Sequence, residues 1–307
     1  DIGGGKLAIL EKNGEKDPLI ILDWIQWHRI THINFVPSMF KIILDTLNHQ
    51  NVAVLKSLKY IFLAGEPLQP ELASRFMQFG TGISLENLYG PTEGTVYASG
   101  YSLSKWNREG PIPIGVPLPN LKLDILDKYG HPQPVGIPGE LCISGAGTAA
   151  GYLNRPELTA ERFIKYRFSG SYKTYTNYKT GDLARWLDDC NIEFLGRIDH
   201  QIKIRGFRIE LGEIENQLLT HEKIKEAILI AREDRSGDKY LCAYIVVKEE
   251  AIPSASSELK EYLAQRLPDY MIPTHFVQLD RIPLTANGKV DKRALPEPQF
   301  NSHLTAY

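Results

Sequence analysis

The sequence contains few cysteines, and they lie far apart. Cys142, Cys190 and Cys242 show neither a CxxC pair nor the spacing of metal ligands. Scattered cysteines of this kind are typical of reduced thiols. We therefore expect a cytoplasmic protein without a cysteine-based metal site.

Blocks of like charge and long apolar runs are also missing. The formal net charge is −2, and charges of both signs alternate along the chain, which argues against nucleic acid as the main partner. Apolar stretches fall short of the ~20 residues that a membrane-spanning helix needs. Residue 1 opens neither a signal peptide nor a transit peptide. We expect no membrane partner.

The chain also lacks a phosphate-binding loop of the G-x-x-x-x-G-K-[ST] type. The glycines at positions 3–5 precede an apolar stretch, residues 6–10, but they do not follow that pattern. We expect a turn and then a strand here. The length of 307 residues, with 43% hydrophobic and 23% charged residues, suits one large or two smaller globular domains.

Residues 1–100 alternate between apolar strand patterns and amphipathic helix patterns. The spacing of apolar residues predicts helices at 19–29, 39–47 and 69–79, and strands at 32–36, 58–64 and 83–88. This alternation indicates a parallel sheet with helices on its faces. In such sheets ligands bind beyond the carboxyl ends of the strands, where Asn34, residues 64–66 and residues 89–93 lie.

The pattern changes after residue 100. Residues 101–198 contain short alternating strands between Pro and Gly clusters, which predicts a small β-rich subdomain with strands at 121–126, 140–144 and 183–187 and a hairpin at 186–193. A compact α+β unit follows from Asp199. There we expect helices at 211–219 and 257–267 and strands at 202–204, 227–231 and 240–247.

The segment from Asn87 to Gly94 is the most informative stretch. Two glycines and a proline force a sharp turn after a strand, and the turn carries an aromatic ring, a hydroxyl and a carboxylate on Tyr89, Thr92 and Glu93. Such a turn can place the ring over a flat heterocycle, the hydroxyl on a phosphate and the carboxylate on a metal ion. The alternative is a loop that merely connects two strands.

Four further segments follow in order, and with the first they carry a resemblance. They are YKTGDL at 178–183, GRID at 196–199, KIRGFRIE at 203–210 and NGKVDK at 287–292. Together with NLYGPTE they resemble the motifs of the adenylation domains of nonribosomal peptide synthetases, which belong with the acyl- and aryl-CoA synthetases and luciferases. The resemblance runs from about residue 1 to residue 298.

The resemblance implies the adenylate-forming fold. Residues 1–198 would be the second half of the large domain, an α/β sheet at 1–100 and a small β-barrel subdomain at 101–198. Residues 199–298 would be the small mobile C-terminal domain, and residues 299–307 a linker toward a carrier domain. The Ser/Thr/Gly-rich loop with which the family holds the ATP phosphates has no match in the sequence, so we expect a C-terminal portion of the domain.

The implied function is the ATP- and Mg²⁺-dependent activation of an amino acid as an aminoacyl-adenylate. The product would pass to the phosphopantetheine thiol of a peptidyl carrier domain, with a condensation domain as neighbour. Two alternatives stay open. The chain could be a truncated, non-catalytic piece that keeps a carrier-docking surface, or it could belong to an acyl- or aryl-CoA ligase; the Pro-rich segment 295–298 favours a multidomain synthetase.

The resemblance also implies roles for single residues. Lys289 would reach the substrate carboxylate and the bridging phosphate oxygen, Thr92 would donate to the α-phosphate or the acyl oxygen, and Glu93 would hold Mg²⁺. Local sequence alone favours a solvated Lys289 and allows a plain salt bridge for Glu93. Asp199 would be the hinge of the small domain. The nucleotide-binding residues would be Gly65, Glu66, Asn87, Tyr89 (stacking on adenine, or else a core tyrosine), Asp182 (accepting from the ribose hydroxyls, or else forming an Asx turn or helix cap) and Arg197 (assisting at the ribose, or else forming a structural ion pair).

Uncharged side chains form the implied acyl pocket. By resemblance it is lined by Asn34, Phe62, Ala64, Leu88, Val96 and Tyr97, with Lys289 at its mouth. A charged substrate side chain would be buried there without a partner, so we expect a small or medium apolar amino acid such as alanine. Lys203 and Arg205, expected on one face of their strand, either meet the carrier domain or form a solvated face. Ala150 stands where the family usually has Arg or Lys, which implies a lost surface or ribose-side contact.

Overall fold

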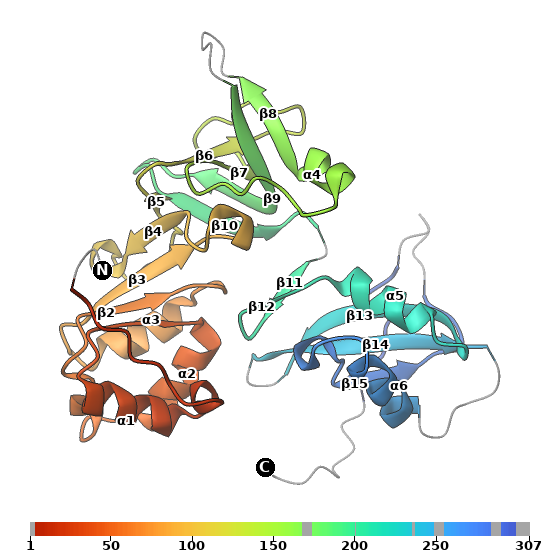
Figure 1. The fold of residues 1–307 in the computed structure, drawn as a ribbon, viewed down its shortest axis with the longest axis horizontal. Helices are drawn as coiled ribbons and strands as arrows, with labels where there is room; N and C mark the ends of the chain where they lie inside the picture. Colours follow the sequence, from red (N-terminus) through yellow and green to blue (C-terminus); the bar gives the residue numbers. More distant parts are fainter. Residues whose placement is uncertain are drawn as a thin grey trace. The chain divides into compact units, whose positions relative to one another are not determined.

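The computed structural model describes residues 4–167, 174–199, 201–234, 237–248, 255–283 and 290–298. The chain divides into two compact units, Asp1–Asp199 and His200–Tyr307. Figure 1 shows the elements of each unit in order along the chain.

A mixed five-stranded sheet opens the first unit. Its order is β1-β2-β3-β4-β5, with parallel pairing among the first three strands and antiparallel pairing beyond them. The predicted α/β sheet is confirmed, but it continues past residue 100, because two later strands pair onto it. The strands are β1 (His32–Phe35), β2 (Tyr60–Leu63), β3 (Ser84–Tyr89), β4 (Ser99–Ser102) and β5 (Val116–Pro117).

Three helices cover one face of this sheet. They are α1 (Pro18–His28), α2 (Pro37–Thr46) and α3 (Pro70–Met77), and each begins with a proline, whose fixed φ suits the first helical position. The Asp17 carboxylate accepts from the Leu19 amide at 2.8 Å and so caps α1. Their apolar residues form one core with the strand residues Ile61 and Leu63. The starts of α1 and α2 lie one or two residues before those predicted, since apolar periodicity does not report an N-terminal proline.

The opposite face of the sheet differs from the expectation of helices on both faces. Strand alternation places Tyr60 and Phe62 there, and His32 stacks beside Tyr60 with ring centroids 5.1 Å apart. Tyr60 is 39% exposed. Among the residues that the structure describes, the helices α1, α2 and α3 share a single core on the other side.

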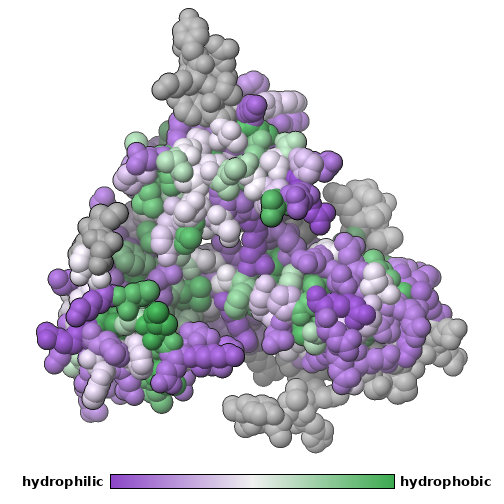
Figure 2. Space-filling view, viewed as in Figure 1, coloured by the Kyte–Doolittle hydropathy of each residue, from purple (hydrophilic) through white to green (hydrophobic). Residues whose placement is uncertain are grey.

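The strand predicted at residues 6–10 is wrong. The described residues 4–11 have no strand structure, and Leu7 and Ile9 are 87% and 75% exposed. A strand needs a neighbour for its backbone groups, and an alternating apolar pattern alone does not provide one. Figure 2 shows apolar side chains gathered over this part of the first unit, where α1 adds the exposed residues Leu19 and Trp27.

An antiparallel sheet forms the rest of the first unit. Its order is β10-β9-β7-β6, and β8 also pairs with β9. Register shifts in β7 and β10 bend this sheet. Among the described residues its edge strands do not pair with each other, so the sheet forms a half-barrel and not a closed barrel. The elements are β6 (Leu121–Leu126), β7 (Gly139–Gly145), α4 (Pro156–Arg162), β8 (Phe163–Arg167), β9 (Thr174–Trp186) and β10 (Ile192–Arg197).

Gly115 joins the two sheets of the first unit. The Ile114 amide donates to the Ile192 carbonyl at 2.8 Å, and the Ile192 amide donates to the Gly115 carbonyl at 2.9 Å. Gly115 has φ +83°, and a Cβ placed on it would lie 1.9 Å from the Gly100 carbonyl oxygen. The position therefore requires glycine for both its backbone conformation and its close approach.

The second unit begins with a tight hairpin and continues as a small α+β domain. Strands β11 (Ile202–Ile204) and β12 (Phe207–Ile209) are joined by Arg205 and Gly206, both at positive φ. Arg205 therefore lies in the turn and does not share a strand face with Lys203, whose cross-strand neighbour is Arg208. The prediction of a shared face is wrong because the strand ends before Arg205.

A three-stranded sheet and two helices complete this unit. The elements are α5 (Leu211–Leu219), β13 (Ile224–Glu233), β14 (Lys239–Val247), α6 (Ala255–Ala264) and β15 (His275–Gln278), and the strand order is β13-β14-β15. The start of the Pro-rich segment packs on this sheet. Leu295 is buried, and the Tyr244 hydroxyl donates to the Pro296 carbonyl at 2.7 Å. This part of the Pro-rich segment thus belongs to the folded unit.

We predict that Gly115→Ala destabilises the first unit by about 2–4 kcal/mol, because the new Cβ must displace backbone and the residue must keep a left-handed φ. Gly212→Ala is the matched control, since a Cβ there meets nothing within 4 Å. Urea unfolding of both variants measures the difference. Equal stability of the two would contradict the proposed junction.

Candidate functional site

The loop after β3 makes a sharp backbone fold. The Ala98 amide donates to the Tyr89 carbonyl at 2.7 Å, and a Cβ on Gly90 would lie 2.4 Å from the Val96 carbonyl oxygen. Thr95 and Val96 both have left-handed φ values, 58° and 72°. Such values are rare for β-branched residues and indicate local strain. The Thr95 hydroxyl donates to the Gly147 carbonyl at 2.6 Å and so holds the loop against the second sheet.

A buried carboxylate lies beside this loop. Asp182 on β9 is 5% exposed and accepts a short hydrogen bond from the Tyr89 hydroxyl. Arg197, directly opposite on β10, contacts it with Nη1 at 2.8 Å from Oδ1 and also donates to the Thr180 carbonyl. Burial and the neighbouring carboxylate hold the pKa of Tyr89 well above its ordinary value. The structure therefore brings three of the predicted nucleotide-binding residues into one cluster.

The same guanidinium continues to the boundary residue Asp199. Arg197 donates from Nε and Nη2 to the two carboxylate oxygens of Asp199, each at 2.6 Å. Asp199 is the last residue of the first unit. Its role as a hinge stays a prediction.

Glu93 is the second buried carboxylate of the site. It lies in the short 3-10 helix Thr92–Gly94 and is 8% exposed. The Tyr152 hydroxyl donates to Glu93 Oε1 at 2.6 Å, and the Ala149 amide donates to the Glu93 carbonyl at 2.9 Å. Thr92, by contrast, is exposed. Tyr152 was not predicted as a site residue, although it lies in a segment, GYLNRPELT, whose resemblance to the family could have pointed to it.

Glu66 and Asn87 have structural partners. The Glu66 carboxylate accepts from the Ser38 amide at 2.9 Å at the start of α2, and the buried Asn87 amide donates to the Pro113 carbonyl at 2.7 Å. Gly65 follows β2 with φ 89°. These contacts position the end of the sheet, and the nucleotide contacts of the three residues stay predictions.

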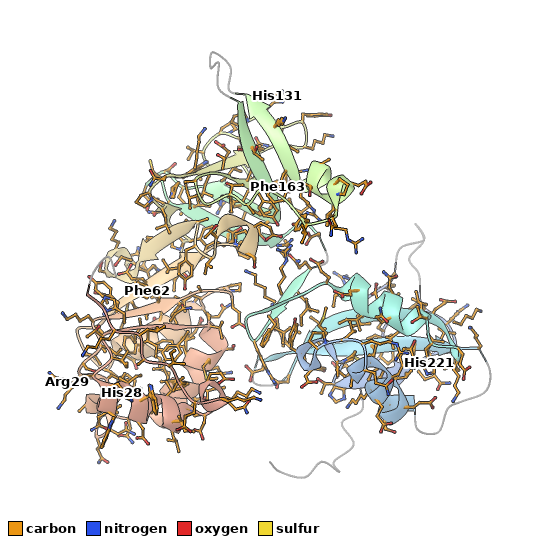
Figure 3. The ribbon with its side chains drawn as sticks, viewed as in Figure 1. His28, Arg29, Phe62, His131, Phe163 and His221 are labelled. Carbon is orange, nitrogen blue, oxygen red and sulfur yellow. The ribbon has the colours of Figure 1, made fainter. Side chains whose placement is uncertain are left out.

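The predicted pocket residues gather on the sheet face that carries the aromatic stack. Asn34 on β1 pairs in register with Phe62 on β2, which is labelled on the first unit in Figure 3. The side chain of Tyr97 lies near that of Asn34, and burial raises the pKa of Tyr97. Ala64 and Leu88 share this face by strand alternation. Val96 is 59% exposed.

One predicted site residue lies outside the part of the chain that the structure describes. Lys289 falls in residues 284–289, which the structure does not describe. In the described ranges no three His, Cys, Asp or Glu side chains are grouped so that they could hold a metal ion. The described helices are also too short or too polar to cross a membrane.

Comparison with known families gives two matches. The model of the AMP-binding enzyme family matches residues 2–153, and the model of the AMP-binding enzyme C-terminal domain matches residues 213–289. The second match includes the predicted lysine, Lys289.

Two curated proteins are similar to nearly the whole chain. Gramicidin S synthase 2 of Brevibacillus brevis is 46% identical over 298 residues, which is 96% of this chain and 6% of that protein. Bacitracin synthase 3 of Bacillus licheniformis is 45% identical over 298 residues, 97% of this chain and 4% of that protein. The chain thus spans only a small part of these relatives.

A solved structure has the same architecture. It is an NRPS protein containing adenylation and PCP domains, bound to a vinylsulfonamide inhibitor. It is 29% identical, with a TM-score of 0.78, over 91% of this chain and 46% of that one. The adenylation-domain resemblance and the predicted fold are therefore confirmed.

We predict that Tyr152→Phe changes the pH dependence of stability. Burial, followed by the hydrogen bond to Glu93, raises the pKa of Tyr152, so its neutral form favours folding below pH ~10 and this contribution is lost as pH rises further. In the variant the decline above pH 10 becomes shallower by less than about 1.4 kcal/mol per pH unit, because solvent screens part of the effect. At pH 8 the lost hydrogen bond costs about 1–2 kcal/mol.

Urea unfolding at pH 8 and between pH 10 and 11 measures both effects. Tyr129→Phe is the control, since Tyr129 is 73% exposed. An identical pH profile in the wild type and in Tyr152→Phe would refute the assignment.

Proposed function

The chain belongs to the family of AMP-binding enzymes, and we propose that it is the C-terminal portion of a nonribosomal peptide synthetase adenylation domain. The whole domain activates an amino acid with ATP. The amino acid carboxylate oxygen bonds to the α-phosphorus, the bond from that phosphorus to its bridging oxygen breaks, and pyrophosphate leaves. The aminoacyl group then passes from AMP to the phosphopantetheine thiol of a carrier domain.

The cluster of Tyr89, Asp182 and Arg197 is the observation that best supports this proposal. It combines an aromatic ring, a buried carboxylate and a cation at the carboxyl end of a parallel strand, the usual place for a nucleotide. A carboxylate there can accept from two vicinal hydroxyls of a ribose. The proposal also assigns the ring of Tyr89 to stack on adenine, although this residue is only 8% exposed and packs in an apolar core.

The environment of Glu93 fits Mg²⁺ bound together with ATP. One oxygen of the buried Glu93 carboxylate accepts from the Tyr152 hydroxyl, and the described residues contain no group of three His, Cys, Asp or Glu side chains that could hold a metal ion. Mg²⁺ is commonly held by one or two carboxylates together with water and substrate phosphates. When bound, it would supply positive charge to the phosphate oxygens. The exposed hydroxyl of Thr92 would donate to the α-phosphate or the acyl oxygen.

The substrate we propose is a small or medium apolar amino acid such as alanine. Phe62 and Tyr97 carry large rings that would leave limited room in the predicted pocket, and the predicted lining residues are uncharged. The relatives named gramicidin S synthase and bacitracin synthase support an amino acid over an aryl acid. The solved NRPS protein with a PCP domain supports a carrier domain as partner, and a condensation domain is the proposed neighbour.

We predict that ATP–pyrophosphate exchange depends on Asp182. The assay uses the 307-residue chain and a longer polypeptide that includes the upstream sequence, against the proteinogenic amino acids and a few hydroxy and aryl acids. Asp182→Asn should raise the KM for ATP about 10- to 100-fold, since hydrogen bonds to a charged group are lost. Asp45→Asn, at an exposed pair with Arg75, is the matched control.

Each outcome decides between the alternatives. Exchange with an apolar amino acid supports the proposal, and exchange with only aryl or fatty acids favours an acyl- or aryl-CoA ligase. Exchange in neither polypeptide would leave the non-catalytic alternative. An unchanged KM in Asp182→Asn would remove the ribose assignment.

We predict that Lys289→Ala separates the two half-reactions. Loss of a cation at the reacting oxygens should lower adenylate formation about 100- to 1,000-fold and largely spare transfer from preformed adenylate to the carrier. Lys292→Ala, in the same segment and exposed, is the control. Stopped assays of adenylate and of carrier thioester measure the two steps. Equal loss of both steps would refute the role of Lys289.

A further inference from the structure

Two arginines hold the carboxylate of Asp199. Arg197 binds both of its oxygens at 2.6 Å, and Nη1 of Arg162 lies 3.9 Å from Oδ2. The side chains are partly buried, with 14% exposure for Arg197, 30% for Arg162 and 31% for Asp199. Ion pairs at such sites are screened less by solvent than pairs on an open surface.

The ion pair between Arg197 and Asp199 packs directly against Gly181. It has φ +73°, and a Cβ placed on it would lie 2.6 Å from Asp199 Oδ2 and 2.7 Å from Arg197 Nη2. The Ile198 amide donates to the Gly181 carbonyl at 2.8 Å. The backbone that leads to the unit boundary is therefore held against β9 at the residue before Asp182.

Arg197 is shared between two carboxylates. Its Nη1 binds Asp182, while Nε and Nη2 bind Asp199, and Nη2 also donates to the Thr180 carbonyl. A nucleotide hydroxyl that donates to Oδ1 of Asp182 would share this oxygen with Nη1 and weaken the bond from Nη1. Loss of that bond would remove one contact of the guanidinium with β9, while the bond from Nη2 to the Thr180 carbonyl remains.

Arg162 comes from a different element. It is the last residue of α4, where the helix dipole favours a cation. Its Nε lies 3.7 Å from Oε1 of the neighbouring residue Glu161. Arg162 therefore joins α4 to the unit boundary without contacting Asp182 in the ion pairs that the structure shows for it.

We propose that Arg162 is a positioning residue for Asp199, and that Arg197 transmits the occupancy of Asp182 to Asp199. The boundary segment is held firmly when Arg197 binds both carboxylates and is loosened when a nucleotide takes the Asp182 oxygen. The second half of this inference rests on the proposed nucleotide site. The contact between Arg162 and Asp199 does not.

Hydrogen exchange of the peptide covering residues 196–204 tests the first half. In the 307-residue chain without ligand, Arg162→Gln should exchange about two to five times faster there than the wild type. Arg162→Lys, which keeps the charge, should fall between them. Glu161→Gln, which removes only the other ion pair of Arg162, should match the wild type.

Peptides covering β2 serve as the internal measure of folding. Faster exchange of Arg162→Gln at 196–204 with unchanged exchange in β2 supports the positioning role. Exchange at 196–204 equal to the wild type overturns it. If Arg162→Gln does not fold, Arg162→Lys decides the same question.

AMP as the probe tests the second half. Binding of AMP should slow exchange around Tyr89 and speed it about two- to fivefold at residues 196–204. In Arg162→Lys the response at 196–204 should be smaller while the Kd for AMP stays the same. AMP protection around Tyr89 without any change at 196–204 overturns the transmission. Absence of any AMP effect refutes the proposed nucleotide site, and the ligand-free comparison of the variants still stands.

Discussion

The buried carboxylate of Asp182 is the constraint on which the site depends. An unpaired charge at 5% exposure would cost several kcal/mol, so it needs a cation and a donor close by. Arg197 supplies the charge from the neighbouring strand β10, and Tyr89 supplies the hydroxyl from β3 of the other sheet. Satisfying one carboxylate thus fixes the placement of three strands and ties the two sheets of the first unit together.

The contacts of Asp182 with Tyr89 and Arg197 also bear on ligand binding. Both oxygens of Asp182 already accept from protein groups, so a ribose bound at the proposed site would have to share or replace these contacts. The net free energy of binding gained from such an exchange of hydrogen bonds is much smaller than the energy of the new bonds taken alone. Part of the exchanged interaction belongs to Arg197, which also binds Asp199. If the proposed nucleotide site is correct, nucleotide recognition and the contact with Asp199 would share one guanidinium.

The sequence predicts the local features of the structure better than the distant contacts. Apolar periodicity placed β1 to β3 and α1 to α3 correctly, because each element depends on its own residues. It failed at Leu7 and Ile9, which form no strand, and at residue 100, because the pairing of β4 with β3 and of β5 with β4 depends on contacts between separate segments. The contact of Tyr152 with Glu93 spans 59 positions, and no local pattern encodes it.

The strain in the loop after Glu93 follows from the same arrangement. Left-handed conformations at Thr95 and Val96 cost about 1–3 kcal/mol each, so other contacts must hold them. Those contacts come from the second sheet and its loops, through Thr95 to the Gly147 carbonyl and through Glu93 to Ala149 and Tyr152. Both buried carboxylates of the site are thus held across the two sheets. The geometry of the site therefore depends on how these sheets join, and the close approach at Gly115 sets that junction.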